Sequence, residues 1–155
     1  MNPRTCRCRP ATRRGFSLVE LVAVLTIAVV LTVLALPTWQ QYVERGWRTQ
    51  ARAELLSAML ALERHALVTA SYASSPSAGT PAGQWPRPVP QPPARTRYWL
   101  TATSCAGLDL SRCVEVRAMP VHADESCGTI ALRSNGEWLS MPVAGDDAIP
   151  LPPEC

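Results

Sequence analysis

The sequence predicts an α+β fold in which one long N-terminal helix packs against a small antiparallel sheet of about four strands. Three observations lead to this prediction. An apolar run covers residues 16–36, amphipathic helical periodicity follows over 37–70, and the hydrophobic period changes to two within 95–155. A helix with one apolar stripe and a sheet with one apolar face bury both surfaces when they pack together.

Residues 1–15 form a basic leader. They contain five arginines and no acidic residue, which favours a cytoplasmic position for this end of the chain. Without the leader the chain has ten arginines and twelve acidic residues, so its net charge is about −2 instead of the +3 of the full sequence. The basic balance therefore belongs to the leader and does not indicate a nucleic-acid partner.

Residues 16–36 have the length of a helix that crosses a membrane. Their polar side chains are Ser17, Glu20, Thr26 and Thr32. About 20 such residues span a hydrocarbon core about 30 Å thick. A carboxylate deep in that core costs about 2.5–3.5 kcal/mol, so we expect Glu20 to have a partner. A signal anchor and a secretory signal peptide with a cut site at 33–35 are alternatives.

The motif at 13–20, Arg-Arg-Gly-Phe-Ser-Leu-Val-Glu, resembles the class III leader of type IV pilins and pseudopilins. The resemblance implies that prepilin peptidase cleaves between Gly15 and Phe16 and that the new N-terminus at Phe16 is methylated. Glu20 is then the fifth residue of the mature chain. Its carboxylate is expected to neutralise the α-amino group of a neighbouring subunit during assembly, because opposite charges attract strongly where water is excluded.

Residues 37–70 are expected to continue the helix. Pro37 removes a helical hydrogen bond and should kink the helix where its two halves join. The residues that recur at helical spacing and form one apolar stripe are Trp47, Ala51, Leu55, Met59, Leu62 and Ala66. The polar faces carry Glu44, Arg48, Arg52, Glu54 and Arg64. A membrane anchor followed by a separate helix is the alternative.

Residues 36–43, Leu-Pro-Thr-Trp-Gln-Gln-Tyr-Val, resemble the L-P-x-Y-x-x-Y-V stretch of PilE-like pilins. Residues 124–132, followed by Asn135-Gly136, are similar to the D-x-C-G-x-L-x-L…G signature near the pilin C-terminus. The resemblance implies the type IV pilin fold. Trp39 stands where a Tyr is usual. Val29 stands where many members have Gly, which argues against melting of the helix there during assembly.

Residues 71–94 are predicted to form a long loop. Their seven prolines are Pro76, Pro81, Pro86, Pro88, Pro90, Pro92 and Pro93. This density excludes a helix or a central strand and favours polyproline-like segments. A plain linker and an exposed partner-binding edge that includes Trp85 are both compatible with the composition.

Residues 95–155 have the alternating pattern of an antiparallel sheet. Strands are expected at 97–103, 113–118, 127–133 and 137–139. The Asn-Gly pair between the last two is a strong hairpin signal.

Four cysteines remain beyond the leader, which carries Cys6 and Cys8. They are Cys105, Cys113, Cys127 and Cys155. An even number in a short extracytoplasmic domain indicates two disulfides, for which the sequence alone allows three connectivities. The resemblance to PilE-like pilins implies Cys127 with Cys155, around the C-terminal D-region, and leaves Cys105 with Cys113.

We predict neither catalysis nor a metal or cofactor site. His65 and His122 lie far apart in the sequence and have no nucleophile motif near them. The acidic pairs Asp124-Glu125 and Asp146-Asp147 are expected to be solvated loop charges. Asp109 and the second pair lack the spacing of a calcium loop.

Basic and aromatic residues alternate around the start of the predicted sheet. They are Trp85, Arg87, Arg95, Arg97, Tyr98 and Trp99. Such interleaving is typical of proteins that bind single-stranded nucleic acid. The candidate DNA contacts are Arg87, Arg95, Arg97 and Trp99, although the acidic balance of the mature chain argues against DNA.

The resemblance implies a structural subunit of a type IV pilus, a minor more than a major pilin, that enters or primes the filament for adhesion, twitching motility or DNA uptake. Expected partners are other pilin subunits, prepilin peptidase and the inner-membrane assembly platform. The chain is expected to cross the inner membrane once, N-terminus inside, and later to join a pilus that spans the periplasm and reaches the exterior. Alternatives are a pseudopilin of type II secretion, a pilus-borne DNA receptor and an anchored periplasmic enzyme.

Overall fold

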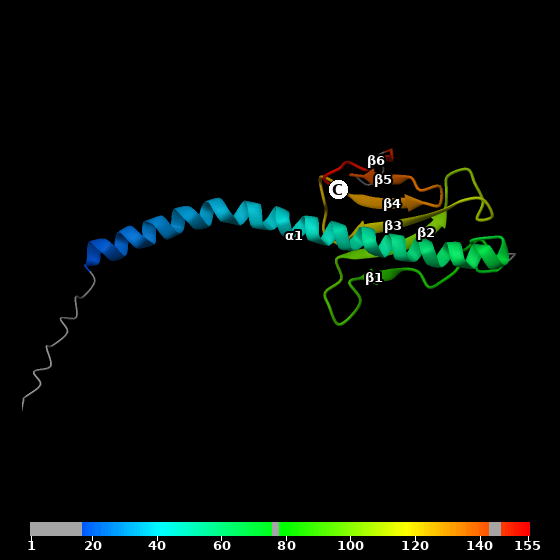
Figure 1. Cartoon of the computed structure of the whole chain (residues 1–155), viewed down its shortest axis with the longest axis horizontal. Helices are drawn as coiled ribbons and strands as arrows, with labels where there is room; N and C mark the ends of the chain where they lie inside the picture. Colours follow the sequence, from blue (N-terminus) through cyan, green and yellow to red (C-terminus); the bar gives the residue numbers. More distant parts are fainter. Residues whose placement is uncertain (1–16, 76–77, 143–146) are drawn as a thin grey trace, which may run out of the picture. The chain divides into compact units, whose positions relative to one another are not determined.

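The computed structural model describes residues 17–75, 78–142 and 147–155, without the side chains of residues 34 and 36–38. In chain order the elements are α1 (Leu18–Thr69), β1 (Arg87–Val89), β2 (Tyr98–Ser104), β3 (Val114–Pro120), β4 (Thr129–Arg133), β5 (Trp138–Met141) and β6 (Ile149–Pro150) (Figure 1). The chain divides into two compact units, Met1–Gln41 and Tyr42–Cys155. The predicted cleavage and methylation sites, Gly15 and Phe16, lie outside the described residues.

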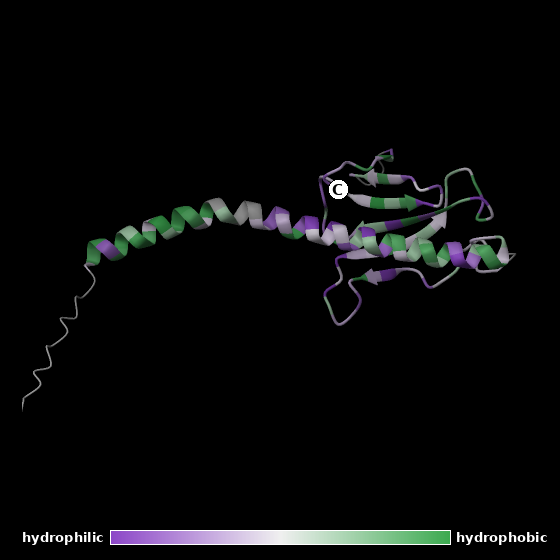
Figure 2. Ribbon diagram, viewed as in Figure 1, coloured by the Kyte–Doolittle hydropathy of each residue, from purple (hydrophilic) through white to green (hydrophobic). Residues whose placement is uncertain are grey.

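The first unit contains the N-terminal half of α1. Every residue from Leu18 to Val33 is exposed, and apolar residues dominate this stretch (Figure 2). The hydroxyls of Thr26 and Thr32 donate hydrogen bonds to the carbonyl oxygens of Ala23 and Ala28, at 2.8 and 2.6 Å. Because these bonds lie within the helix, the two hydroxyls need no outside partner.

Glu20 lies exposed in the first turn of α1, where a carboxylate interacts favourably with the N-terminal end of the helix dipole. In the part of the chain that the structure describes, no helix is both long enough and apolar enough to cross a membrane. The predicted kink falls on Pro37, whose side chain is not described, and α1 runs as one helix from Leu18 to Thr69.

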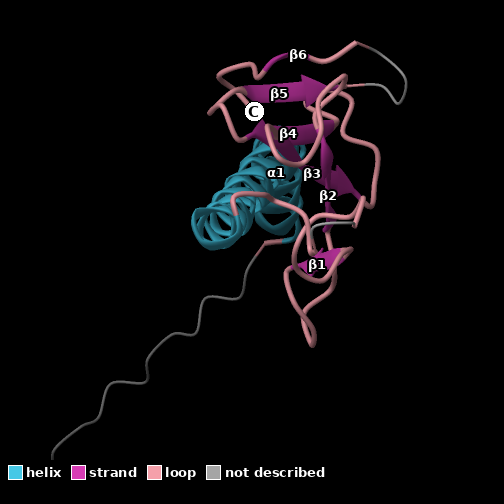
Figure 3. Ribbon diagram, turned by 90° about the vertical axis from the view of Figure 1, so that its right-hand side faces the viewer, coloured by secondary structure: helices cyan, strands magenta, loops and turns pink. Residues whose placement is uncertain are grey.

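The second unit is a sheet with the C-terminal half of α1 on one face (Figure 3). The strands follow chain order, and each pairs antiparallel with the next. The buried core contains Ala51, Leu55, Ala58, Met59 and Leu62 of α1 with Val89, Tyr98, Leu100, Val114, Val116, Ala118, Ile130 and Leu132 of the sheet. The prediction of an α+β fold is confirmed, because the helix stripe and the inner face of the sheet bury each other.

The sheet has six strands where the sequence predicted about four. The additional strands are its two edges, β1 within the predicted loop 71–94 and β6 in the Pro-rich tail. Both contain a proline, and proline is tolerated in an edge strand because one side of that strand needs no ladder hydrogen bonds. The predicted exclusion of a helix or a central strand from 71–94 is consistent with this edge strand, but the prediction of a loop did not include the three residues of β1.

Two disulfides lie in the second unit, Cys105–Cys113 and Cys127–Cys155. They are the pairs that the resemblance to pilins implies. The first closes the connection between β2 and β3, and the second ties the buried C-terminus to the start of β4. At Gly128 φ is +54°, and a Cβ would lie 1.9 Å from the carbonyl oxygen of Met141. The signature around Cys127 therefore requires glycine at this position.

Candidate functional site

A pocket of about 360 Å³ opens between α1, the start of β2 and the loop that precedes β4. Its lining includes Trp47 and Arg48 of α1, Arg97 and Tyr98 at the start of β2, and Asp124 of the loop. Residues from three separate parts of the chain thus meet at one place in the second unit.

A buried ion pair forms one wall of this pocket. Arg48 donates hydrogen bonds from Nε and Nη2 to the two carboxylate oxygens of Asp124, each at 2.8 Å. The two side chains are only 9% and 13% exposed. The predictions that Arg48 lies on a polar helix face and that Asp124 is a solvated loop charge are wrong, because the two charges satisfy each other inside the fold.

The protonation states of Arg48, Asp124 and Tyr98 in the pocket lining suit a structural role. Burial by itself would raise the pKa of Asp124, but the hydrogen bonds from Arg48 and from the backbone N–H groups of Cys127 and Ser126 outweigh burial and lower that pKa. The hydrogen bond to Asp124 raises the pKa of Arg48. Burial raises the pKa of Tyr98 to about 12. At neutral pH the pair is therefore fully charged and the phenol fully protonated.

Two of the candidate DNA-contact arginines lie over tryptophan rings. The guanidinium carbon of Arg87 is 4.6 Å from the ring centroid of Trp85, and that of Arg97 is 5.1 Å from the ring centroid of Trp47. Such cation–π contacts hold a guanidinium in one place. The Nε atoms of both arginines are buried and have no hydrogen-bond partner among the residues that the structure describes. Buried donors without partners are rare in native proteins and call for an explanation.

The other two candidates lie apart from these stacks. Arg95 is exposed in the connection between β1 and β2. Trp99 lies between Tyr98 and Leu100, which are buried in the core, so its side chain is on the opposite face of β2, where it is 40% exposed. The structure therefore does not join the four candidates into one stacking platform.

Charge is segregated along the sequence of the second unit, although in space Arg97 lines the pocket together with Glu44, Asp124 and Glu125. No acidic residue occurs between Glu63 and Asp109, a stretch that contains Arg64, Arg87, Arg95 and Arg97. We call the last three of these arginines the basic edge, because they come from β1 and its connection to β2. Within the described residues, none of the three forms an ion pair. This local pattern, and not the net charge, is the signal in the sequence for an anionic partner.

The histidines form no catalytic or metal site in the described part of the chain. His65 is half-buried with Nε2 2.8 Å from the carbonyl oxygen of Ala73, and His122 is exposed. No three His, Cys, Asp or Glu side chains in that part lie close enough together to hold a metal ion. Asp146 is outside the described residues.

Two family models match the chain. The prokaryotic N-terminal methylation motif matches residues 10–36. The model of the type IV minor pilin ComP, DNA uptake sequence receptor, matches residues 37–131, which is more than half of the chain and includes the basic edge. No curated protein and no solved structure gives a match. The chain therefore belongs to the family of the type IV minor pilin ComP, DNA uptake sequence receptor.

Proposed function

We propose that this minor pilin binds DNA through its basic edge and carries it on a type IV pilus. The observation that carries the proposal is the acid-free stretch between Glu63 and Asp109. It places three arginines, unpaired within the described residues, along one edge of a subunit whose family is described as a DNA uptake sequence receptor.

The physical basis is neutralisation of phosphate charge. Duplex DNA carries about one negative charge per 1.7 Å of helix axis, and arginines that neutralise phosphates release condensed counterions. Arg87 and Arg97 are already held on tryptophan rings. Because these side chains are preorganised, they lose less conformational entropy when DNA binds. Phosphate contacts fix position without reading sequence, so selectivity for one uptake sequence requires contacts to bases as well.

The test is the binding of a short labelled DNA duplex of mixed sequence to the purified unit Tyr42–Cys155, followed by fluorescence anisotropy over a series of salt concentrations. We expect Arg95→Gln and Arg97→Gln each to weaken binding about tenfold. Each should also reduce the slope of log K against log salt by about 0.9.

The matched control is Arg52→Gln. Arg52 also lies over a tryptophan, 5.2 Å from the ring centroid of Trp138, but that ring belongs to β5, away from the basic edge. This variant should bind DNA as the unaltered protein does. An equal loss in the control would mean that only net charge matters, and no binding by the unaltered unit would contradict the proposal.

We further propose that the chain matures as a pilin with a PilE-like helix. Prepilin peptidase cuts after Gly15, Phe16 is methylated, and the chain crosses the inner membrane once with its N-terminus inside. Glu20 then docks the subunit at the assembly platform by neutralising the α-amino group of a neighbour. The match to the methylation motif over 10–36 supports this maturation, and the place of Glu20 in the first turn of α1 agrees with it.

Gly15→Asp tests the cleavage. The variant should stay in the membrane at full length, because the peptidase needs a small residue before the scissile bond. N-terminal sequencing of the mature protein decides the site, and efficient cleavage of the variant at the same bond would overturn it. A pseudopilin of type II secretion shares the leader, but the match over 37–131 is to a pilus protein and favours the pilus.

A further inference from the structure

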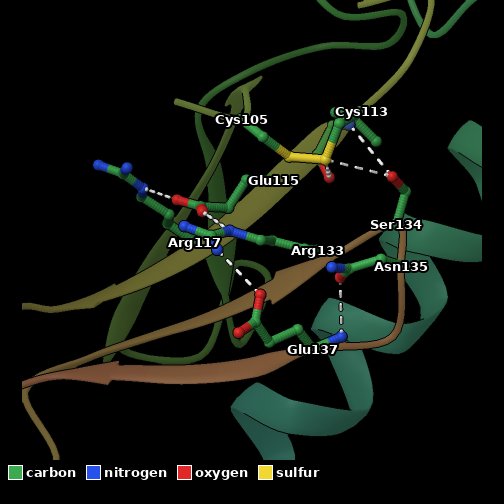
Figure 4. Close-up of polar contacts among 9 residues, drawn as sticks. Cys105, Cys113, Glu115, Arg117, Arg133, Ser134, Asn135 and Glu137 are labelled. Carbon is green, nitrogen blue, oxygen red and sulfur yellow. Dashed lines mark hydrogen bonds and ion pairs between the residues drawn. A yellow bond between two sulfur atoms is a disulfide. The ribbon is translucent and has the colours of Figure 1, made fainter. Parts of the chain in front are cut away.

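The outer face of the sheet, which points away from α1, carries a buried carboxylate between two guanidinium groups (Figure 4). Glu115 of β3 is 2% exposed. One of its oxygens accepts a hydrogen bond from Nε of Arg117, and the other accepts one from Nε of Arg133 at 2.7 Å. Arg133 also donates from Nη1 to Glu137 at 2.9 Å.

Strand geometry explains why these side chains meet. In β3 the residues Val114, Val116 and Ala118 are buried in the core. Because side chains alternate along a strand, Glu115 and Arg117 lie on the outer face. Residue 133 of β4 is directly opposite Glu115 in the antiparallel register, a position from which opposite charges interact across strands.

The carboxylate leaves the outer end of Arg117 uncommitted, whereas Arg133 also donates from Nη1 to Glu137. A guanidinium has five N–H donors, and in the described part of the chain Arg117 uses only its Nε, to Glu115. Its side chain is 42% exposed. Arg48 provides the contrast, because Asp124 engages both its Nε and Nη2 and buries the group. Glu115 thus holds both arginines by Nε. Within the described residues, both terminal nitrogens of Arg117 and Nη2 of Arg133 form no hydrogen bond.

We propose that Arg117 and Arg133 contact DNA phosphates on the outer face of the sheet, and that Glu115 is a positioning residue for both. This proposal rests on the proposed DNA binding and extends it from the basic edge to a second face. Terminal N–H groups of a held guanidinium suit the two oxygens of a phosphate. Trp99 and Met119, paired across β2 and β3 on the same face and each 40% exposed, are apolar neighbours for sugars and bases.

The experiment uses the full-length chain, purified in detergent, and the same labelled duplex of mixed sequence. Arg117→Gln and Arg133→Gln should each weaken binding about tenfold and reduce the salt slope by about 0.9. Arg52→Gln, with the same change of charge on the other side of the sheet, should leave both quantities unchanged.

The variant Glu115→Gln tests whether Glu115 acts on DNA binding by positioning the two arginines or only through its own negative charge. It removes a negative charge, so electrostatics alone would make DNA binding tighter. If Glu115 positions the two arginines, binding instead becomes weaker and the salt slope falls. Thermal unfolding shows whether the variant is folded. If it is not, Arg117→Lys decides the question, because lysine keeps the charge but has no fork that can hold Glu115 and a phosphate together.

Each result bears on one claim. If the unaltered chain does not bind the duplex, the proposed function and this assignment both fail. If Arg97→Gln weakens binding while Arg117→Gln, Arg133→Gln and Arg117→Lys do not, only the assignment of the outer face fails. Tighter binding by folded Glu115→Gln overturns positioning. If the outer-face variants bind DNA normally but no longer enter pili, this face is a contact between subunits. That result would overturn the proposal.

Discussion

The two halves of α1 share one helical backbone but differ in where their apolar side chains find partners. From Leu18 to Val33 every residue is exposed. In the second half, Ala51, Leu55 and Leu62 are at most 2% exposed and pack against the sheet. The second half is therefore stabilised inside the subunit. The first half depends on its surroundings, which for a pilin are first a membrane and then the filament.

Substituting one leucine in each half should give the largest contrast. Leu55→Ala removes a fully buried side chain and should lower the free energy of unfolding of the second unit by about 4 kcal/mol. Leu25→Ala, at an exposed position, should not change that free energy. Urea unfolding followed by tryptophan fluorescence measures the free energy of unfolding of both variants. Similar losses in the two would contradict the inference that only the second half of α1 is stabilised inside the subunit.

Removing the disulfide that closes the longer loop should lower the free energy of unfolding more than removing the other. The sequence separation is 28 residues for Cys127–Cys155 and 8 for Cys105–Cys113. The chain-entropy model predicts a loss of about 3.6 kcal/mol for Cys155→Ser and about 2.6 kcal/mol for Cys105→Ser. The same unfolding assay applies, and a larger loss for Cys105→Ser would show that native contacts outweigh loop entropy.

The ion pair between Arg48 of α1 and Asp124 of the loop before β4 should contribute about as much to the free energy of unfolding as one disulfide. Arg48→Ala leaves Asp124 buried without its partner and should cost about 3 kcal/mol at pH 7. Arg52→Ala, which removes an exposed arginine of the same helix, is the control and should cost much less.

The ion pair between Arg48 and Asp124 should also make the stability of the second unit depend on pH. The folded pKa of Asp124 lies below its ordinary value, so its contribution is complete above about pH 4 and is lost as the pH falls through the folded pKa. Asp124→Asn should therefore be less stable than the unaltered protein at pH 7 and closer to it in strong acid. A stability difference that stays constant down to pH 2 would contradict this.

In the first half of α1, the smallest effect on stability is expected at Glu20. Glu20→Gln keeps the shape of the side chain and should not change unfolding of the second unit. Incorporation into pili should fall, because the docking charge is gone. Immunoblots of sheared pili and of membranes measure the distribution of the subunit. Normal amounts of the variant in pili would show that Glu20 is not needed for docking.

Elements with strong local patterns were predictable from the sequence. The stripe through Leu55 and Leu62 has helical spacing and is buried as expected, and the Asn135-Gly136 pair forms the turn between β4 and β5, with φ of +85° at Gly136. The edge strands β1 and β6 were missed. Proline density argues against strands in general, and only the tertiary structure shows that these residues lie at an edge.

The site was less predictable because its contacts join distant residues. Arg97 was a candidate from its neighbours, but its ring partner Trp47 is 50 positions away on the helix stripe. The alternation in β3 indicates that Glu115 and Arg117 share a face. Their link to Arg133 depends on the register between β3 and β4, which no local pattern in the sequence specifies.

The proline inside β1 has a consequence for how subunits meet. The carbonyl oxygen of Val89 accepts a hydrogen bond from the N–H of Arg97 at 2.7 Å, so Val89 faces β2, and Pro88, its neighbour in the strand, faces outward. The free edge of this three-residue strand therefore has no N–H to offer. A strand from another molecule would find no N–H donors there, so subunits that lie side by side are not expected to extend the sheet at its β1 edge.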